Sequence, residues 1–217
     1  MTANKPVKKS PRRGRGRPTL DQAADIDKRL LDIALQEFLE HGYGGASMSR
    51  MVRNAGVSKT TLYSRFSSKE AMFRAIIERQ IEKLSPGELL ISREGPLGLE
   101  AGLRRYAYHM VDVSLTGELL GVNRLMDSES HRFPELGKAA AMRTSLGIDR
   151  IAGFIADCAA RGGYRCRDPR AVAEVFILAI RGWYIDVMLT HRKVTPKQRH
   201  ACIDKTIHVL ISSFEHW

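Results

Sequence analysis

Ser47–Phe66 reads SMSRMVRNAGVSKTTLYSRF, and it is the most informative stretch of the chain. Gly56 supplies a left-handed backbone turn that a residue with a Cβ resists. Ser58 then caps a second short helix. Two short helices joined by a tight glycine turn predict a helix-turn-helix, whose second helix enters the major groove of DNA. The residues predicted to face inward from this unit are Met48, Met51, Val52, Ala55, Val57, Leu62 and Phe66.

The second helix of this unit carries polar chemistry suited to DNA. Ser47–Lys69 contains five basic residues and no acidic one, so nothing in it repels a phosphate backbone. Lys69 begins the next predicted helix, where backbone N–H groups and the helix dipole favour a phosphate. An ordinary helical hairpin with a solvated basic face is the alternative interpretation. The predicted exposed set consists of Lys59, Thr60, Thr61, Tyr63, Ser64 and Arg65.

The charge of the whole chain is concentrated around this unit. The 217 residues carry a net charge of +11 and give a pI near 9.9. Met1–Leu20 has seven basic residues and no acid, whereas Asp21–Ala46 has two bases and six acids. Glu70–Trp217 is close to neutral, with 21 bases and 18 acids. We therefore expect the N-terminal third of the chain to meet a polyanion.

Composition excludes several classes of protein. A hydrophobic content of 43% is enough to form a core, so wholesale disorder is excluded. The longest apolar run, Val175–Ile180, is far shorter than the roughly 20 residues that span a bilayer. No apolar segment follows the basic N-terminus as in a secretory signal, and three cysteines do not make a disulfide framework. We expect a cytoplasmic protein that does not enter membranes.

The rest of the sequence predicts an all-α fold. Asp168-Pro169 and Thr195-Pro196 are typical helix starts, and Ser67–Glu70 has the spacing of a capping box. No segment alternates with the period of two that indicates a half-buried strand. We expect a disordered basic arm over 1–20, a helix-turn-helix domain over 21–69 and a larger helical domain over 70–217. Helices are predicted near 25–41, 47–54, 58–65, 68–84, 98–117, 119–129, 134–161, 168–190 and 196–215.

Leu30–Lys69 resembles the DNA-binding domain of the tetracycline-repressor (TetR) family. The family pattern has Phe-x-x-x-Gly-Tyr, here Phe38–Tyr43, and then A-G-V-S-x-x-x-L-Y-x-x-F-x-x-K-E, here Ala55–Glu70. Met51-Val52 departs from the usual Ile-Ala, and Arg65 replaces a frequent His. The resemblance implies base-edge contacts by Lys59, Thr60 and Thr61, and phosphate contacts by Ser47, Ser58, Tyr63, Arg65 and Lys69.

The N-terminal arm contains Arg-Gly-Arg-Pro, which is similar to the core of an AT-hook. In that motif an extended backbone lays arginines into a narrow minor groove. Arg13, Arg15 and Arg17 are the candidates for this contact. The alternative is a solvated tail that adds only non-specific affinity. Both versions predict a steep dependence of DNA binding on salt.

The resemblance also implies a homodimer on a palindromic operator, with two recognition helices about 34–36 Å apart. The helix near 168–190 is apolar nearly all round, so it needs partners on every side. In this family the final two helices pair with their symmetry mates as a four-helix bundle, and burial within one protomer is the alternative. The predicted interface residues are Val172, Phe176, Ile203, Ile207, Leu210, Ile211 and Phe214.

The C-terminal region resembles, more loosely, the AefR-like subset of the family. This match is carried by Arg132–Leu136 and by the helix that Asp168-Pro169 starts. The family role is a repressor that a small molecule releases from DNA by binding inside this domain. Five large residues are candidates to line such an effector pocket, and for each of them the alternative is that it is an ordinary residue of the hydrophobic core. These residues are Tyr106, Met110, Phe154, Phe176 and Trp183.

Two other kinds of function were weighed against this one. His200, Cys202 and His208 lie in one predicted helix, with the two histidines eight residues apart, and they are the candidates for a metal site. No C-x-x-C or H-E-x-x-H motif supports such a site, and we predict no metal or cofactor. No nucleophile elbow or phosphate loop indicates an enzyme. An architectural protein that binds DNA with arm and helix-turn-helix together, without an effector, is the second alternative.

Overall fold

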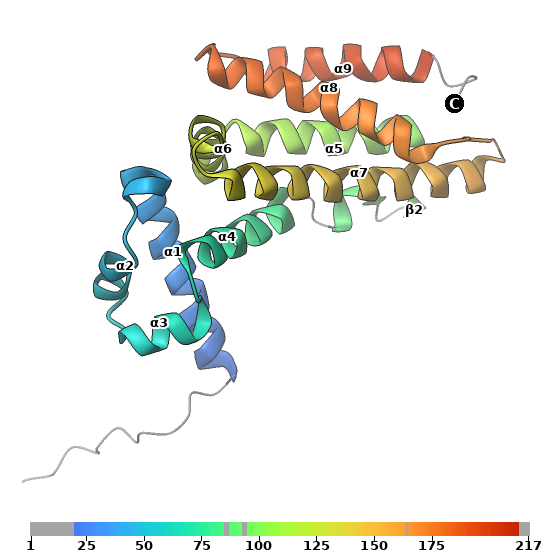
Figure 1. Cartoon of the computed structure of the whole chain (residues 1–217). Helices are drawn as coiled ribbons and strands as arrows, with labels where there is room; N and C mark the ends of the chain where they lie inside the picture. The colour runs from blue at the N-terminus through green and yellow to red at the C-terminus, as the bar shows by residue number, and fades with distance from the viewer. Residues whose placement is uncertain (1–19, 85–86, 93–94, 164, 213–217) are drawn as a thin grey trace, which may run out of the picture.

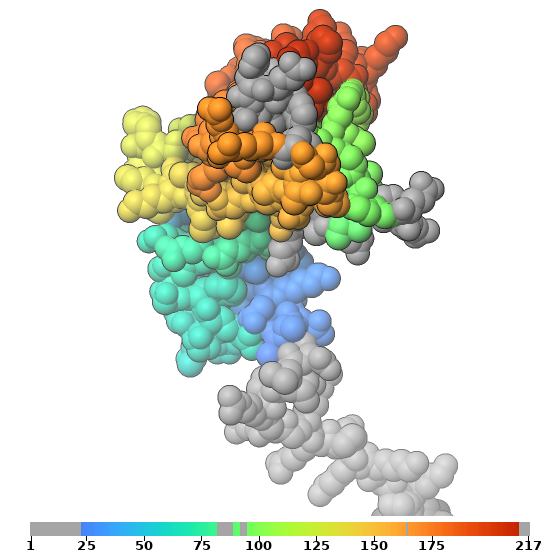
Figure 2. Space-filling view, turned by 90° about the vertical axis from the view of Figure 1, so that its right-hand side faces the viewer, coloured from blue at the N-terminus to red at the C-terminus, as the bar shows by residue number. Residues whose placement is uncertain are grey.

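The computed structural model describes residues 20–84, 87–92, 95–163 and 165–212, and it confirms the all-α prediction. Arg13, Arg15, Arg17 and Phe214 lie outside the described residues. The N-terminal helices form one lobe and the C-terminal helices form the other (Figures 1 and 2). None of the described helices is both long and apolar enough to cross a bilayer.

The N-terminal lobe consists of α1 (Leu20–Gly45), α2 (Met48–Ala55), α3 (Lys59–Arg65) and α4 (Lys69–Leu84). Leu30, Phe38, Met51 and Leu62 are fully buried and hold α1, α2 and α3 together. Helix α4 packs against α1 and also contacts α7 of the larger lobe. Because α4 belongs to the core of the small lobe and also contacts the large one, it links the two lobes mechanically (Figure 1).

The C-terminal lobe consists of α5 (Leu99–Ser114), α6 (Gly117–Glu129), α7 (Pro134–Gly162), α8 (Pro169–Leu189) and α9 (Pro196–Ser212). Helix α7 packs along α8, and α9 packs along α5 (Figure 1). A single-turn 3-10 helix, η1 (Gly87–Leu90), precedes a two-residue hairpin of β1 (Ile91–Ser92) and β2 (Gly95–Pro96). These two-residue strands are too short to give the alternating pattern that sequence analysis detects.

Several predicted helix ends are confirmed and two are corrected. The Asp168 carboxylate accepts a hydrogen bond from Ala171 N, and Thr195 and Gln198 cap each other reciprocally. The cap of α4 is Ser68 rather than Ser67, because the Ser68 hydroxyl accepts from Ala71 N. Helix α1 begins at Leu20, earlier than the predicted residue 25.

Candidate functional site

The turn between α2 and α3 has the predicted left-handed backbone. Gly56 lies at φ 62° and ψ 30°, and its N–H donates to the carbonyl of Arg53 at 3.2 Å. The N–H of Val57 donates to the Val52 carbonyl, which completes the end of α2. The side chain of a residue other than glycine is strained at this backbone geometry, so Gly56 sets the angle between the two helices.

Helix α3 is anchored at one face and open at the other. The Ser58 hydroxyl caps the helix by accepting from Thr61 N at 3.0 Å, and Leu62 is completely buried beneath it. Lys59, Thr60 and Tyr63 are exposed, with 49% of Tyr63 accessible. This exposed face, which we call the α3 face, presents an ammonium group and hydroxyls on a rigid support.

The residues predicted to contact bases and phosphates are not equivalent in their surroundings. Lys59 and Thr60 lie on the α3 face, but Thr61 is half-buried and its hydroxyl lies 2.8 Å from the Ser58 hydroxyl. Ser58 is exposed, and Ser47 is half-buried at the start of α2. The base and phosphate contacts of these residues stay predictions.

Arg65 and Lys69 already have partners within the protein. The Arg65 guanidinium pairs with the Asp27 carboxylate and donates to the Ala23 carbonyl at 3.1 Å. Lys69 Nζ donates to the Tyr43 carbonyl at 2.6 Å and lies 4.7 Å from the centre of the Tyr43 ring. The phosphate contacts predicted for these two cations therefore compete with contacts that hold α1 in place.

Glu37 organises the junction of α1 and α2, and the sequence analysis missed it. Its carboxylate is 4% exposed and accepts from Ser47 N at 2.8 Å and from Arg50 Nε at 2.7 Å. Burial on its own raises the pKa of Glu37, but the hydrogen bonds from Arg50 and Ser47 outweigh it, so the pKa lies below its ordinary value. The signal in the sequence was an acid at an otherwise apolar helix position.

A second carboxylate, that of Glu129 at the end of α6, joins the two lobes. It accepts from Tyr43 N at 2.7 Å and from Gly44 N at 3.1 Å, both just beyond the bend of α1 at Gly42. Gly42 has φ 69°, and a Cβ placed there would lie only 2.6 Å from Glu129 Oε1. Gly42 directly follows the predicted end of the first helix at residue 41, and it is thus also where α6 docks. We call these contacts the Glu129 clamp.

Aromatic packing reinforces the Glu129 clamp. The Phe133 ring lies 4.9 Å from the Tyr43 ring and at a steep angle to it, between α6 and α7. Tyr43 is 1% exposed and also packs against Phe38 and Phe73 in the core of the small lobe. A movement of the end of α6 is therefore transmitted directly to α1.

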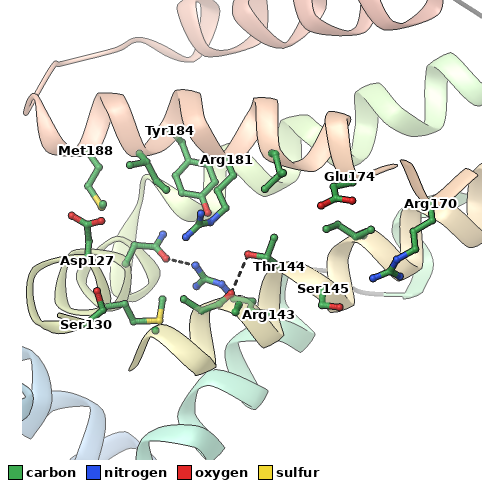
Figure 3. Close-up of a pocket in the computed structure, with 18 residues that line it drawn as sticks. Asp127, Ser130, Arg143, Thr144, Ser145, Arg170, Glu174, Arg181, Tyr184 and Met188 are labelled. Carbon is green, nitrogen blue, oxygen red and sulfur yellow. Dashed lines mark hydrogen bonds between the residues drawn. The ribbon is translucent and has the colours of Figure 1, made fainter. Parts of the chain in front are cut away.

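Two adjoining cavities lie between α7 and α8, with volumes of about 480 and 210 Å³. Figure 3 shows the larger one, with α6 at one end. Both cavities lie within the domain in which the sequence analysis expected an effector. The side chains that border both cavities are Arg143, Thr144, Arg181 and Tyr184.

The predicted effector residues divide into two groups. Tyr106 and Met110 line the smaller cavity. Phe154, Phe176 and Trp183 line neither of these two cavities, although Phe154 lines a separate one beside the β1–β2 hairpin, and the effector role of all three stays a prediction. Phe176 is fully buried in the core, and the Phe154 ring fills the space that Gly102 leaves by having no side chain.

The polar residues of these cavities were missed by the sequence analysis. Arg143 is 9% exposed, and its guanidinium donates to the Asn123 side chain of α6 at 2.8 Å. Arg181 lies on α8 and points toward Arg143 (Figure 3). A usable signal was present, because Arg181 directly follows the long apolar run Val175–Ile180. A basic residue inside a helix that is apolar nearly all round calls for a partner or a function.

The predicted dimer residues also need correction. Phe176, Ile203 and Ile207 are completely buried within the protomer, because α5 and α7 cover them. For these three residues the alternative of burial within one chain is the correct one. Val172, Leu210 and Ile211 are half-buried. On the described parts of these two helices, the exposed large apolar side chains are instead Val175, Leu178 and Leu189 of α8, with 61%, 44% and 56% accessible, and Val209 of α9, with 70%.

His200, one of the three candidate metal ligands, contacts α5. His200 Nε2 lies 3.2 Å from the Asp112 carboxylate, and its ring stacks on Tyr108 at 3.9 Å. These contacts fasten α9 to α5. Among the described residues, no group of three or more His, Cys, Asp or Glu side chains is arranged to hold a metal ion.

Comparison with known proteins identifies both lobes. Residues 30–76 match the model of bacterial regulatory proteins of the tetR family, and residues 101–215 match the C-terminal domain of AefR-like transcriptional repressors. The chain belongs to the TetR family. It is a helix-turn-helix transcriptional regulator, and the relatives are regulators rather than enzymes.

Individual TetR-family relatives agree with this assignment. The chain is 39% identical over 80 residues to the transcriptional repressor ComR of Escherichia coli, which is 36% of this chain and 34% of ComR. It is 39% identical over 59 residues to the transcriptional activator FasR of Mycolicibacterium smegmatis, 27% of each protein. The chain thus matches well under two thirds of either relative. The solved structure of the flavonoid-responsive regulator FrrA is 26% identical with a TM-score of 0.71, over 88% of this chain and 97% of FrrA.

Proposed function

We propose that this protein is a homodimeric repressor that binds a palindromic operator and is released by a small molecule bound between α7 and α8. The observation that carries the proposal is the position of α6. The C-terminal half of this helix borders the larger cavity through Asn123, Met126 and Asp127, and its last residue, Glu129, forms the clamp on α1. An event in the cavity is therefore connected physically to the helix-turn-helix.

The α3 face supports sequence-specific binding to DNA. Lys59 and Thr60 are exposed near the start of α3, and side chains near the start of a recognition helix reach the base edges in the major groove. Arg53, on α2, and Lys59 are exposed, and neither pairs with a carboxylate among the residues that the structure describes. Both cations are thus available for DNA.

The exposed apolar side chains of α8 and α9 support a dimer. Val175 and Leu178 are three residues apart, so they share one face of α8. Contiguous apolar side chains left in water commonly mark an interaction surface. A second copy of the chain related by a two-fold axis would cover this face and place the two α3 helices on the two halves of a palindrome.

Coupling between the cavity and DNA runs through two residues of α6. Asn123 accepts from Arg143 at the cavity, and Glu129 holds α1. At 1.5 Å rise per residue, these positions are about 9 Å apart along the axis of α6. A ligand that draws Arg143 away from Asn123 shifts α6, and the Glu129 clamp then moves α1. The orientation of α3 changes with it, which lowers the affinity for the operator.

Footprinting on the DNA that flanks the protein's own gene tests the proposal. We expect a discrete protected palindrome that binds two chains. Replacing Lys59 and Thr60 with Ala should weaken operator binding at least tenfold, because each base contact contributes about 1–3 kcal/mol. Lys193→Ala, an exposed lysine between α8 and α9, is the control and should leave the affinity unchanged.

Broad protection without a palindrome would contradict the proposal and favour an architectural protein. Operator affinity unchanged in the double variant would show that the α3 face does not read DNA.

A further inference from the structure

Two guanidinium groups that border both cavities between α7 and α8 have no carboxylate partner among the described residues. Arg143 comes from α7 and Arg181 from α8, and their side chains extend toward each other beside Tyr184 (Figure 3). In the part of the chain that the structure describes, neither forms an ion pair. Asp127 and Glu174 line the larger cavity, but both are exposed and neither pairs with these arginines.

The buried guanidinium of Arg143 is held in place with an unused donor. Its Nη2 donates to Asn123 Oδ1 at 2.8 Å, and Asn123 Nδ2 donates in turn to the Ser114 carbonyl at 3.1 Å. Arg143 Nη1 and Arg181 Nε are both buried, and neither has a hydrogen-bond partner among the described residues. A buried charged donor without an acceptor is costly, so an anion bound here would gain hydrogen bonds from donors that the protein itself leaves unused.

The positive charges of Arg143 and Arg181 also favour a bound anion. Burial lowers the pKa of the Arg143 guanidinium; the neighbouring Tyr184 hydroxyl opposes this shift, and the positive charge of nearby Arg181 adds to it. An arginine stays protonated in spite of this, so the two like charges destabilise each other across the cavity. An anion placed between them would remove both penalties.

The smaller cavity adds an apolar wall to this cationic site. Ile81, Met110, Leu146 and Ile177 line it, and none of its lining residues is acidic. Its volume is about 210 Å³, and it adjoins the larger cavity, with which it shares lining side chains. The site therefore combines a pair of guanidiniums with space for a hydrocarbon group.

We propose that the effector is an amphiphilic organic acid whose carboxylate accepts hydrogen bonds from Arg143 and Arg181 while its apolar part lies against Met110, Leu146 and Ile177. A planar guanidinium fork matches a carboxylate with two parallel hydrogen bonds, which gives both affinity and orientation. This inference rests on the proposed function and names the chemical class of its ligand. Arg143 is also the residue that contacts Asn123 of α6, so the acid binds at the start of the path to the Glu129 clamp.

Calorimetric titration of the full chain with two acids and their matched alcohols tests this inference. The acids are octanoate and 1-naphthoate, and the neutral partners are 1-octanol and 1-naphthalenemethanol. We expect at least one acid to bind ten times more tightly than its alcohol. Arg143→Gln should remove this preference, and Arg143→Lys, which keeps the charge but not the fork, should retain part of it.

Two further variants make the result independent of the stability of Arg143→Gln. Arg181→Gln removes the second guanidinium from a half-buried position and should also lower acid affinity at least tenfold. Arg192→Gln is the control, since this exposed arginine just beyond α8 pairs with Asp186 and makes the same change in net charge. It should bind the acids as the natural protein does.

The inference is overturned if neither acid binds better than its alcohol. It is also overturned if Arg143→Gln and Arg181→Gln both keep the natural acid affinity. Because these titrations contain no DNA, they separate the two proposals. Acid binding without operator recognition would refute the proposed repressor alone, and operator recognition without acid binding would refute this inference alone.

Discussion

The arginines at the helix junctions of the small lobe differ from those at the cavities of the large lobe in having carboxylate partners. In the small lobe, Arg50 pairs with Glu37 and Arg65 pairs with Asp27, so these cations fix the helices that carry the α3 face. In the large lobe, Arg143 and Arg181 face cavities and lack a carboxylate partner among the described residues. The paired cations of the DNA-binding lobe thus stabilise its fold, whereas Arg143 and Arg181 each have a buried donor group without an acceptor among the described residues.

This difference suits the small lobe to rigid presentation of the α3 face and the large lobe to a response to a ligand. A lobe whose buried charges are paired has one favourable arrangement, and it presents the α3 face rigidly. A lobe with an unpaired buried guanidinium is stabilised when a ligand supplies the missing acceptor, and this stabilisation is available to shift α6. The Glu129 clamp is where the two lobes meet.

The largest expected effect separates the core of the large lobe from its exposed face. Phe176→Ala should lower the free energy of unfolding by about 3–5 kcal/mol, because the ring is fully buried against α5 and α7. Val175→Asp, at the adjacent exposed position, should instead raise the dissociation constant of the dimer and change the stability of the protomer little. Denaturation at fixed protein concentration and sedimentation measure the two quantities. Dimer loss in Phe176→Ala with an intact dimer in Val175→Asp would reverse our assignment.

A smaller effect tests the pairing of charges in the small lobe. The pKa of Glu37 is lower in the folded chain than its ordinary value of 4.5, so its ionised form stabilises the fold above that pH. Glu37→Gln should cost about 1.5–3 kcal/mol at pH 7, as expected for charged hydrogen bonds. This contribution should be lost as the pH falls through the folded pKa, so the two denaturation midpoints should converge in acid. Glu40→Gln, at an exposed position of the same helix, is the control. A difference that is constant with pH would contradict the role of the Glu37 charge.

The smallest effect concerns the basic arm. Removing residues 1–19 takes away seven positive charges and leaves α1, which begins at Leu20, complete. If the arm binds phosphates, the slope of log Kd against log salt should become less steep by roughly 0.9 for each phosphate that the arm neutralises in the full chain. Anisotropy of labelled operator over a range of salt measures the slope. An unchanged slope would show that the arm takes no part in the complex.

The helix-turn-helix was predictable because its signals are local. Gly56, Ser58 and Leu62 lie within seven residues, and each has a fixed stereochemical role in a turn, a cap or a buried face. The same local information explains why the helices were assigned correctly to within a few residues. Ser68 as the cap of α4 shows the limit, since two adjacent serines give the same pattern.

The cavity and the Glu129 clamp were not predictable in this way because they join distant residues. Glu129 bonds to backbone N–H groups more than eighty positions earlier in the chain, and a backbone donor leaves no trace in the sequence. Large apolar residues were expected to line the effector site, but Phe154 and Phe176 are core residues instead. Periodicity indicates which side of a helix is buried, and it does not distinguish a packed core from a cavity.

The Glu129 clamp is the proposed link between the cavity and the operator, and one comparison tests it most directly. Operator affinity is measured with and without saturating octanoate for the natural protein and for Glu129→Gln, with octanoate affinity measured separately. We predict that the variant binds octanoate normally while the ratio of the two operator dissociation constants falls toward one. An unchanged ratio in a folded variant would show that cavity and DNA do not communicate through Glu129.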